Sequence, residues 1–124
     1  EWLAAHPDQV TDLLDTNPSY VFFKLGKPGT SGSKGSMGRR ITPWVSVATD
    51  QSVLPNGLLT LMNVTLPDEG GEHSVPFNAL TLPQDTGGAI KHNRVDLFCG
   101  NGETATHTAS YLDNRGAVFL LLPR

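Results

Sequence analysis

The sequence predicts a mainly β domain, with one or two short helices, folded as a small barrel. The apolar runs are short and turns separate them, since the chain has 13 glycines and 9 prolines. Many short strands joined by such turns are typical of small barrels. At 124 residues and 38% hydrophobic content, the chain suits one domain with a single core.

The first 16 residues are expected to form a helix that leads into the barrel domain, residues 17–124. Pro7 suits a first helical turn, and Asn17-Pro18 ends the run. The apolar residues of this segment share one helical face: Leu3, Val10, Leu13 and Leu14.

The barrel strands are predicted from apolar runs bounded by turn residues. After a short β run at 20–23, the Gly, Ser and Lys content of residues 26–40 indicates a long loop. Pro76 favours a sheet edge or a strand start, because proline cannot donate a ladder hydrogen bond. Further strands are expected at 44–48, 58–64, 74–82, 95–98 and 117–122, with a short helix at 103–112.

The composition of the chain argues against several classes of protein. The net charge of −3 argues against a nucleic-acid binder, which would carry a basic stripe. No apolar run approaches the length of a membrane span, and the single Cys99 rules out an internal disulfide. Because the chain begins at Glu1 without a methionine or signal peptide, we expect a processed product or a piece of a longer protein.

Two aspartates are the most informative candidates for a catalytic role. Asp85 sits on a predicted glycine turn, and Asp96 follows eleven positions later inside an apolar strand. Strand alternation should place Asp96 and Phe98 on one face. A carboxylate in such a place needs compensation, and a cleft in which a proton is transferred would provide it. For Asp85 the alternative is a plain turn in which the carboxylate accepts backbone N–H bonds.

Asp85-Thr86-Gly87 also matches the catalytic triplet of aspartic proteases, but its context fits poorly. Leu82-Pro83-Gln84 precedes it in place of an apolar strand, and no apolar-apolar-Gly sequence follows. A protease is therefore only a distant alternative. A phosphate loop at residues 29–36 is rejected, because Ser33 stands where the motif needs a glycine before Lys34.

Histidine and cysteine patterns predict neither a metal site nor a cofactor. Cys99 is expected to pack as a small hydrophobic residue, although a nucleophilic pair of Cys99 with His107 or His92 stays open. The histidines show no ligand spacing: His6, His73, His92 and His107.

Four blocks together resemble the membrane-bound lytic murein transglycosylase A family. They occur in the family's order at 17–23, 45–50, 84–91 and 94–98, and the closing run 116–124 also resembles the end of such proteins. The resemblance implies a six-stranded double-psi β-barrel, forming the carboxy-terminal third of the enzyme. It also implies cleavage of the MurNAc–GlcNAc β-1,4 bond of peptidoglycan glycan strands, leaving 1,6-anhydro-MurNAc. The implied location is periplasmic, with an outer-membrane anchor elsewhere in the full-length protein.

The resemblance also assigns a site. Asp96 falls on the single catalytic acid/base, which donates a proton to the glycosidic oxygen and then accepts one from the C6 hydroxyl. Asp85 falls on a neighbouring aspartate of the same site, and Lys91 is expected to keep it ionised. Glycine at 87 and 88 is expected to permit a special backbone conformation or a close approach of the sugar chain. With the residues expected from their own chemistry included, the predicted substrate-binding set is Asp50, Gly87, Gly88, Lys91 and Tyr20.

Two departures from the family pattern lie near this site. His92-Asn93 stands where small residues such as glycine are usual, and Cys99 is unusual after the Asp96 strand. The amino-terminal portion of such enzymes, which forms the other wall of the groove, is not visible in this sequence. The alternative function is therefore an expansin-like barrel that grips glycan without cleaving it.

Overall fold

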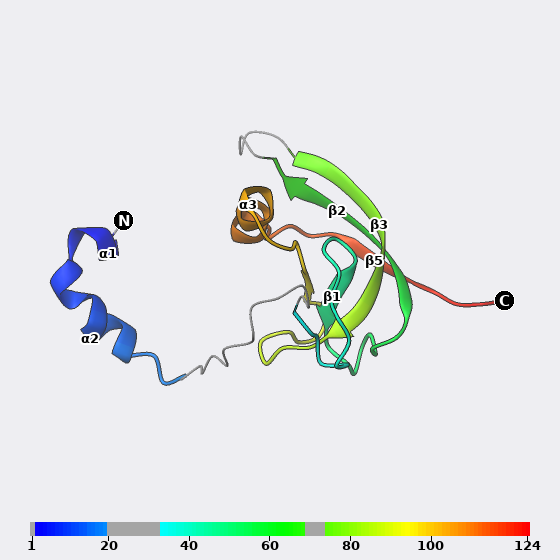
Figure 1. The fold of residues 1–124 in the computed structure, drawn as a ribbon, viewed down its shortest axis with the longest axis horizontal. Helices are drawn as coiled ribbons and strands as arrows, with labels where there is room; N and C mark the ends of the chain where they lie inside the picture. Colours follow the sequence, from blue (N-terminus) through cyan, green and yellow to red (C-terminus); the bar gives the residue numbers. More distant parts are fainter. Residues whose placement is uncertain (1, 20–32, 69–73) are drawn as a thin grey trace.

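The computed structural model describes residues 2–19, 33–68 and 74–124, and Figure 1 shows how its elements are arranged. The helical elements are α1 Trp2–Ala5, the 3-10 turn η1 Pro7–Gln9, α2 Val10–Asp15 and α3 Glu103–Tyr111. The strands are β1 Ser46–Thr49, β2 Leu59–Pro67, β3 Ser74–Asp85, β4 Val95–Leu97 and β5 Ala117–Leu121.

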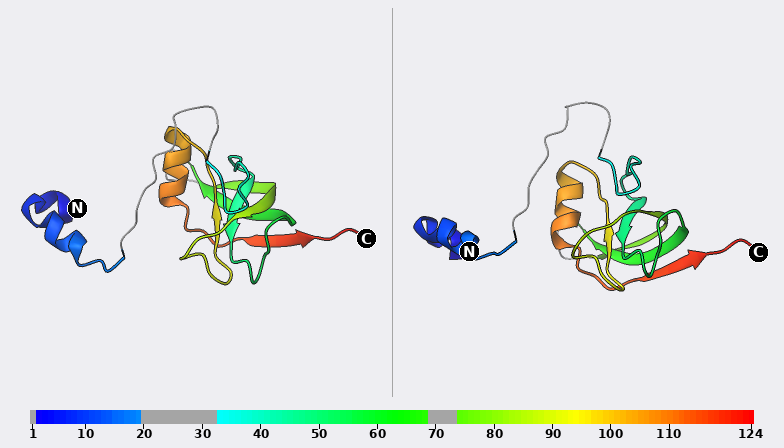
Figure 2. Two further views of the ribbon diagram at one scale, coloured as in Figure 1. Left: turned by 60° about the horizontal axis from the view of Figure 1, so that its bottom comes forward. Right: turned by 90° about the horizontal axis from the view of Figure 1, so that it is seen from below.

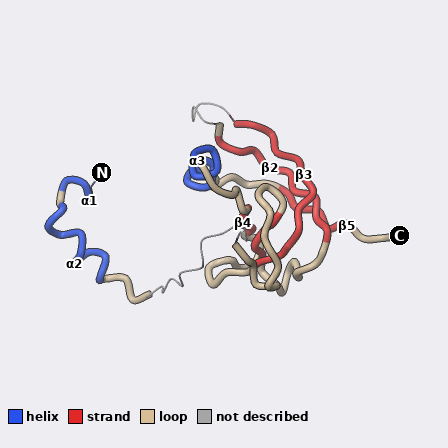
Figure 3. The backbone as a smooth tube through the Cα atoms, viewed as in Figure 1, coloured by secondary structure: helices blue, strands red, loops and turns tan. Residues whose placement is uncertain are grey.

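The strands form one mixed sheet in the order β4-β1-β3-β2-β5. β3 is the longest strand, with 12 residues, and it joins the two halves of the sheet. Its first part pairs with β2, and its end, from Leu82 to Asp85, runs parallel to β1. The long strands β2 and β3 curve strongly, and β1 and the short β4, which continue the same sheet, lie inside this curve (Figures 1 and 3).

The predicted closed, six-stranded double-psi barrel is wrong for the described part of this chain. β4 and β5 are the two edges of a five-stranded sheet, and they do not pair with each other. A barrel closes only when its edge strands meet in register. The sequence pattern indicates where strands lie but not which edges meet. The β run expected at 20–23 lies outside the described residues.

The core is small, and threonines take part in it. Alternate residues of β2 face inward, so Thr60 and Met62 are buried. The Thr60 hydroxyl donates to the Thr81 carbonyl oxygen at 2.9 Å, and the two hydroxyl oxygens lie 2.7 Å apart. Buried hydroxyls are tolerated when they are bonded in this way. The β2–β3 pairing therefore fixes the register of the strand that ends at Asp85.

The amino-terminal segment is helical, but it is not the single helix that was predicted. It is interrupted at His6, whose φ of −133° and ψ of 61° are not helical. The cause is Pro7, because a residue before proline is disfavoured in the α region. The Trp2 and His6 rings stack at 4.2 Å, and none of these helical residues is buried. The sheet and α3 form the body that carries the site (Figure 2).

No helix within the described ranges is long and apolar enough to cross a membrane. α3 packs beside β2 and buries Ala105 and Thr108. The segment after α3 then leads into β5, on the far edge of the sheet from β4.

Candidate functional site

Asp96 lies in β4, where the antiparallel register places it opposite Ala48 of β1. Two backbone bonds extend this pairing: Trp44 N–H donates to Phe98 O at 2.8 Å, and Phe98 N–H donates to Ser46 O at 3.0 Å. The Asp96 side chain is 43% exposed. The strand therefore fixes the backbone of Asp96 while its carboxyl group remains accessible from outside.

The smaller of two cavities at Asp96 brings the two expected catalytic aspartates together. It measures about 260 Å³, and both Asp85 and Asp96 line it. Its other walls are largely apolar, with Ile41, Val47, Ile90 and Phe98 among them. Asp85 and Asp96, eleven positions apart in sequence, thus line one cavity because β3 and β4 both pair with β1.

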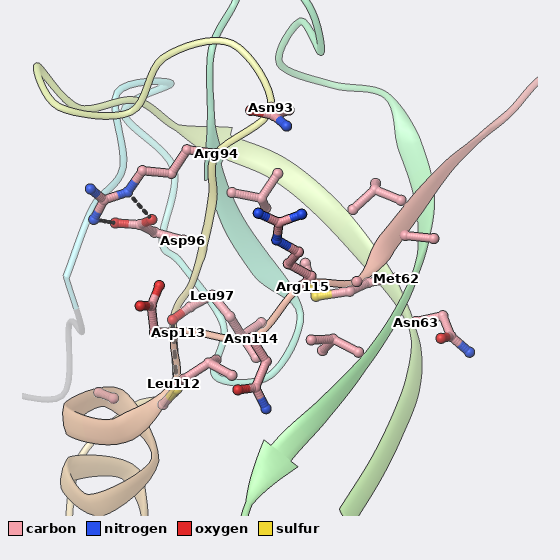
Figure 4. A pocket seen from close by; sticks show the side chains of 17 residues that line it. Met62, Asn63, Asn93, Arg94, Asp96, Leu97, Leu112, Asp113, Asn114 and Arg115 are labelled. Atoms are coloured by element: carbon pink, nitrogen blue, oxygen red, sulfur yellow. Dashed lines mark hydrogen bonds and ion pairs between the residues drawn. The ribbon is translucent and has the colours of Figure 1, made fainter.

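The larger cavity, about 780 Å³, gathers charged groups around Asp96. Arg94 immediately precedes β4, whereas Asp113 and Arg115 come from the segment between α3 and β5. Figure 4 shows the Arg94 guanidinium bound to Asp96 at the rim, with Asp113 on the same side. Met62 and Leu97 contribute to the apolar wall of this cavity.

Main-chain donors hold Asp85 in place. Its Oδ1 accepts the N–H groups of Ser36 and Thr86, each at 2.9 Å. Gly35 permits this contact, because a Cβ at that position would collide with the Gln84 carbonyl oxygen. Asp85 is the last residue of β3, so the predicted strand continues three residues beyond its expected end. The carboxylate therefore ties the loop around Ser36 to the strand end beside Asp96.

Asp50 is also held by donors, but it lines neither cavity. Its Oδ1 accepts the Ser52 hydroxyl at 2.7 Å, and its Oδ2 accepts the His92 N–H at 2.8 Å. The Ser52 hydroxyl, followed by the His92 and Ser52 N–H groups, lowers the pKa of Asp50 from its usual 3.8 to about 2. His92 has a left-handed φ of 57°, a conformation that glycine adopts easily. Asp50 thus stabilises the turn that leads into β4.

Three other expected site residues sit on the turn between β3 and β4. A Cβ on Gly87 would lie 2.9 Å from Ile90 Cδ1, whereas Gly88 has open space around it. Neither glycine has a left-handed φ. The Lys91 charge acts on Asp50, although it was expected to act on Asp85. Tyr20 lies outside the described residues.

Cys99 is buried and has none of the features of a nucleophile. Its Sγ donates to Leu97 O at 3.6 Å, and burial raises the pKa of the thiol. His107 Nε2 is bonded to Asp68 O at 2.7 Å, and its ring contacts Tyr111. Within the described ranges, no group of three or more His, Cys, Asp or Glu residues could hold a metal ion.

Sequence reasoning missed Arg94. Its Nε lies 2.8 Å from Asp96 Oδ1, and its Nη2 lies 3.1 Å from Oδ2. The pair raises the pKa of Arg94, chiefly through the hydrogen bond to Asp96. The signal was present, since residues two apart on a strand share a face. The role of the Ser36 N–H, 49 positions from Asp85, had no comparable signal.

Comparisons with known proteins identify the family of this chain. The family model described as the 3D domain matches residues 45–122. A membrane-bound lytic murein transglycosylase A of Vibrio cholerae is 38% identical over 98% of this chain and 33% of its own length. Its Escherichia coli counterpart is 34% identical over 97% of this chain. The chain spans about a third of the length of these curated relatives.

Solved structures give the same result. The lytic transglycosylase LtgG of Burkholderia pseudomallei is 38% identical, with a TM-score of 0.68 over 96% of this chain and 35% of that one. E. coli MltA with bound chitohexaose is 32% identical, with a TM-score of 0.83 over 96% of this chain and 36% of that one.

Proposed function

Because this chain belongs to the 3D domain family, in the form found in membrane-bound lytic murein transglycosylase A, we propose that it carries the catalytic centre of such an enzyme. The reaction is cleavage of the MurNAc–GlcNAc β-1,4 bond of peptidoglycan with formation of 1,6-anhydro-MurNAc. The single observation that carries the proposal is the shared cavity of Asp85 and Asp96, in which Asp96 is accessible.

One carboxyl group is enough for this chemistry. Ordinary glycoside hydrolysis uses two, one as acid and one as base or nucleophile. Here the nucleophile is the substrate's own C6 hydroxyl, already held near C1, which lowers the entropic barrier. Asp96 donates its proton to the glycosidic oxygen as the C1–O bond breaks. Its carboxylate then takes the C6 hydroxyl proton as the C6 oxygen bonds to C1, so Asp96 ends each cycle protonated.

Asp85 contributes a fixed charge. Its two N–H donors stabilise and orient the carboxylate. A fixed negative charge in the same cavity stabilises the positive charge that develops on the sugar ring as the bond breaks. Asp85 therefore acts without exchanging a proton. Asp50 acts indirectly, because it accepts the His92 N–H and so stabilises the turn that leads into β4.

We assign glycan contacts to the exposed turn between β3 and β4. Gly88 and Lys91 are both exposed there. Asp85 precedes this turn and Asp96 follows it, and both aspartates line the smaller cavity. Gly87 packs closely against Ile90, which lines the cavity. Tyr20 stays a sequence-based candidate for stacking on a sugar ring. Since the relatives are named membrane-bound, we place the full-length protein in the periplasm with an outer-membrane anchor.

A second candidate function is glycan binding without cleavage. It is favoured by one observation, namely that the Asp96 carboxylate is already engaged by Arg94. Both functions use the same groups and differ only in whether Asp96 exchanges a proton.

Digestion of purified peptidoglycan with this chain, followed by mass spectrometry, separates these functions. The proposal predicts anhydro-muropeptides, which are lighter by one water than the products of hydrolysis. Asp96→Asn should abolish most of this release, and Asp12→Asn is its matched control, because Asp12 is exposed in α2 and lines neither cavity. Products with ordinary reducing ends would contradict the reaction type. Sedimentation with peptidoglycan but no release of fragments would favour the binding function.

A further inference from the structure

Arg94 and Asp96 form a two-pronged ion pair at the rim of the larger cavity. Arg94 immediately precedes β4, and its position two residues before Asp96 places both side chains on one face of the chain. Nε bonds Oδ1 at 2.8 Å and Nη2 bonds Oδ2 at 3.1 Å. Such a fork fixes the orientation of a carboxylate.

This geometry belongs to the site before a glycan strand binds. The pair orients the Asp96 carboxylate in that state. The acid step needs a protonated Asp96 with a free edge toward the glycosidic oxygen, which the pair prevents. The pair must therefore open before the first step.

The pair is well placed to open. The side chains of Arg94 and Asp96 are 57% and 43% exposed, and exposed ion pairs contribute little free energy. A sugar that enters the cavity can displace the guanidinium at small cost. A second carboxylate, Asp113, lines the same cavity and also raises the pKa of Arg94, by less than Asp96 does. Arg94 therefore has another acidic partner when it leaves Asp96.

Two further charged groups face Asp96 from other elements. Asp85, at the end of β3, shares the smaller cavity with it, and Arg115, before β5, shares the larger one. Main-chain N–H groups hold Asp85. Arg115 makes no ion pair within the described ranges. Arg94 is thus the group that must move if Asp96 is to gain a proton.

We propose that Arg94 is a positioning residue that holds Asp96 as an oriented carboxylate until a bound glycan strand displaces it toward Asp113. When the pair opens, Asp96 takes a proton from solvent and enters the cycle as the acid. After the product leaves, Arg94 returns and the proton goes back to solvent. This inference rests on the proposed function of Asp96.

The first test compares kcat and KM of the parent chain, Arg94→Gln and Arg94→Lys on peptidoglycan. Glutamine removes the ion pair that a glycan strand must displace, so KM should fall by about two- to fivefold while kcat stays near that of the parent. Lysine keeps the charge but cannot form the two-pronged pair, so its KM should lie between those of the other two chains. A KM of Arg94→Gln equal to or above that of the parent would overturn the inference.

A second test does not depend on activity, and it separates failure of the inference from failure of the proposed function. NMR follows the Arg94 Nε–H signal of the parent chain while chitohexaose is added. The inference predicts that this signal moves and exchanges faster with water as the sugar binds, and that Asp113→Asn weakens the change. An unchanged signal at saturation, or no binding of chitohexaose, would overturn the displacement. If the signal changes as predicted but no anhydro product is released, the result would support the displacement of Arg94 and contradict the proposed reaction.

Discussion

Asp85 and Asp96 line the same small cavity, but the protein holds them in different ways. Asp85 accepts two main-chain N–H groups, from Ser36 and Thr86. Asp96 is bound by one exposed side chain, that of Arg94. Main-chain donors cannot leave without local unfolding, whereas a surface arginine can rotate away. The Asp85 carboxylate is thus fixed by the main chain, whereas the partner of Asp96 can leave.

The same difference extends to Asp50. Three donors hold it, two of them main-chain N–H groups, and its pKa falls to about 2. Its carboxylate is therefore, like that of Asp85, fixed by main-chain donors. All three aspartates that the family resemblance singles out are partly exposed, and only Asp96 accepts no main-chain N–H group from the described residues. The following predictions test this division, beginning with the largest effect.

Replacement of Asp96 by asparagine should cause the largest loss. General acid–base catalysis is typically worth about 10²–10⁴ in rate, so we expect release of anhydro-muropeptides to fall by at least about 100-fold. The melting temperature should stay near that of the parent, because the side chain is exposed and bound only by Arg94. A large fall in melting temperature that accompanies the loss of activity would indicate that Asp96 has a structural role instead.

The sequence was a good guide to the position of Asp96 and a poor guide to closure of the sheet. A short apolar run containing one aspartate predicts a strand whose carboxylate needs a partner, and β4 has that form, with Arg94 as the partner. Closure depends on which edges meet, and no residue pattern in β4 or β5 encodes that. The hydrogen bond from Ser36 to Asp85 could not be predicted from the sequence either. Its donor is the Ser36 main-chain N–H, and a main-chain donor leaves no residue pattern.

Gly35→Ala should be the most damaging change on the Asp85 side. The added methyl group would collide with the backbone oxygen of Gln84, so the loop that carries Ser36 must move. Overpacking of this kind costs about 1–3 kcal/mol, which urea unfolding would measure. Gly88→Ala is the matched control, since nothing lies within 4 Å of the added carbon, and it should stay within about 0.5 kcal/mol of the parent. Equal losses for the two variants would contradict the loop geometry.

Asp85→Asn should have a smaller effect on rate than Asp96→Asn. The amide keeps an oxygen that can accept the Ser36 and Thr86 N–H groups, so the loop should stay in place. Loss of the charge removes about 1 kcal/mol of electrostatic stabilisation, which corresponds to about a fivefold lower rate. Initial rates of anhydro-muropeptide release measure this. A loss as large as that of Asp96→Asn would make Asp85 a partner in proton transfer.

The smallest effect concerns acid stability. The pKa of Asp50 is about 2 when folded, below its ordinary 3.8, so its stabilisation is complete above about pH 4 and is lost as the pH falls toward 2. Asp50→Asn should therefore flatten the change in urea midpoint between these pH values. An unaltered pH dependence in the variant would show that the Ser52 and His92 bonds do not stabilise the fold.

The central claim is that Asp96 exchanges the proton while Asp85 does not. The most direct measurement is the rate of anhydro-muropeptide release by the parent, Asp96→Asn and Asp85→Asn on one peptidoglycan preparation, with melting temperatures recorded for all three. The account predicts that Asp96→Asn is at least about tenfold slower than Asp85→Asn at similar thermal stability. Equal rates for the two variants, or a faster Asp96→Asn, would contradict it.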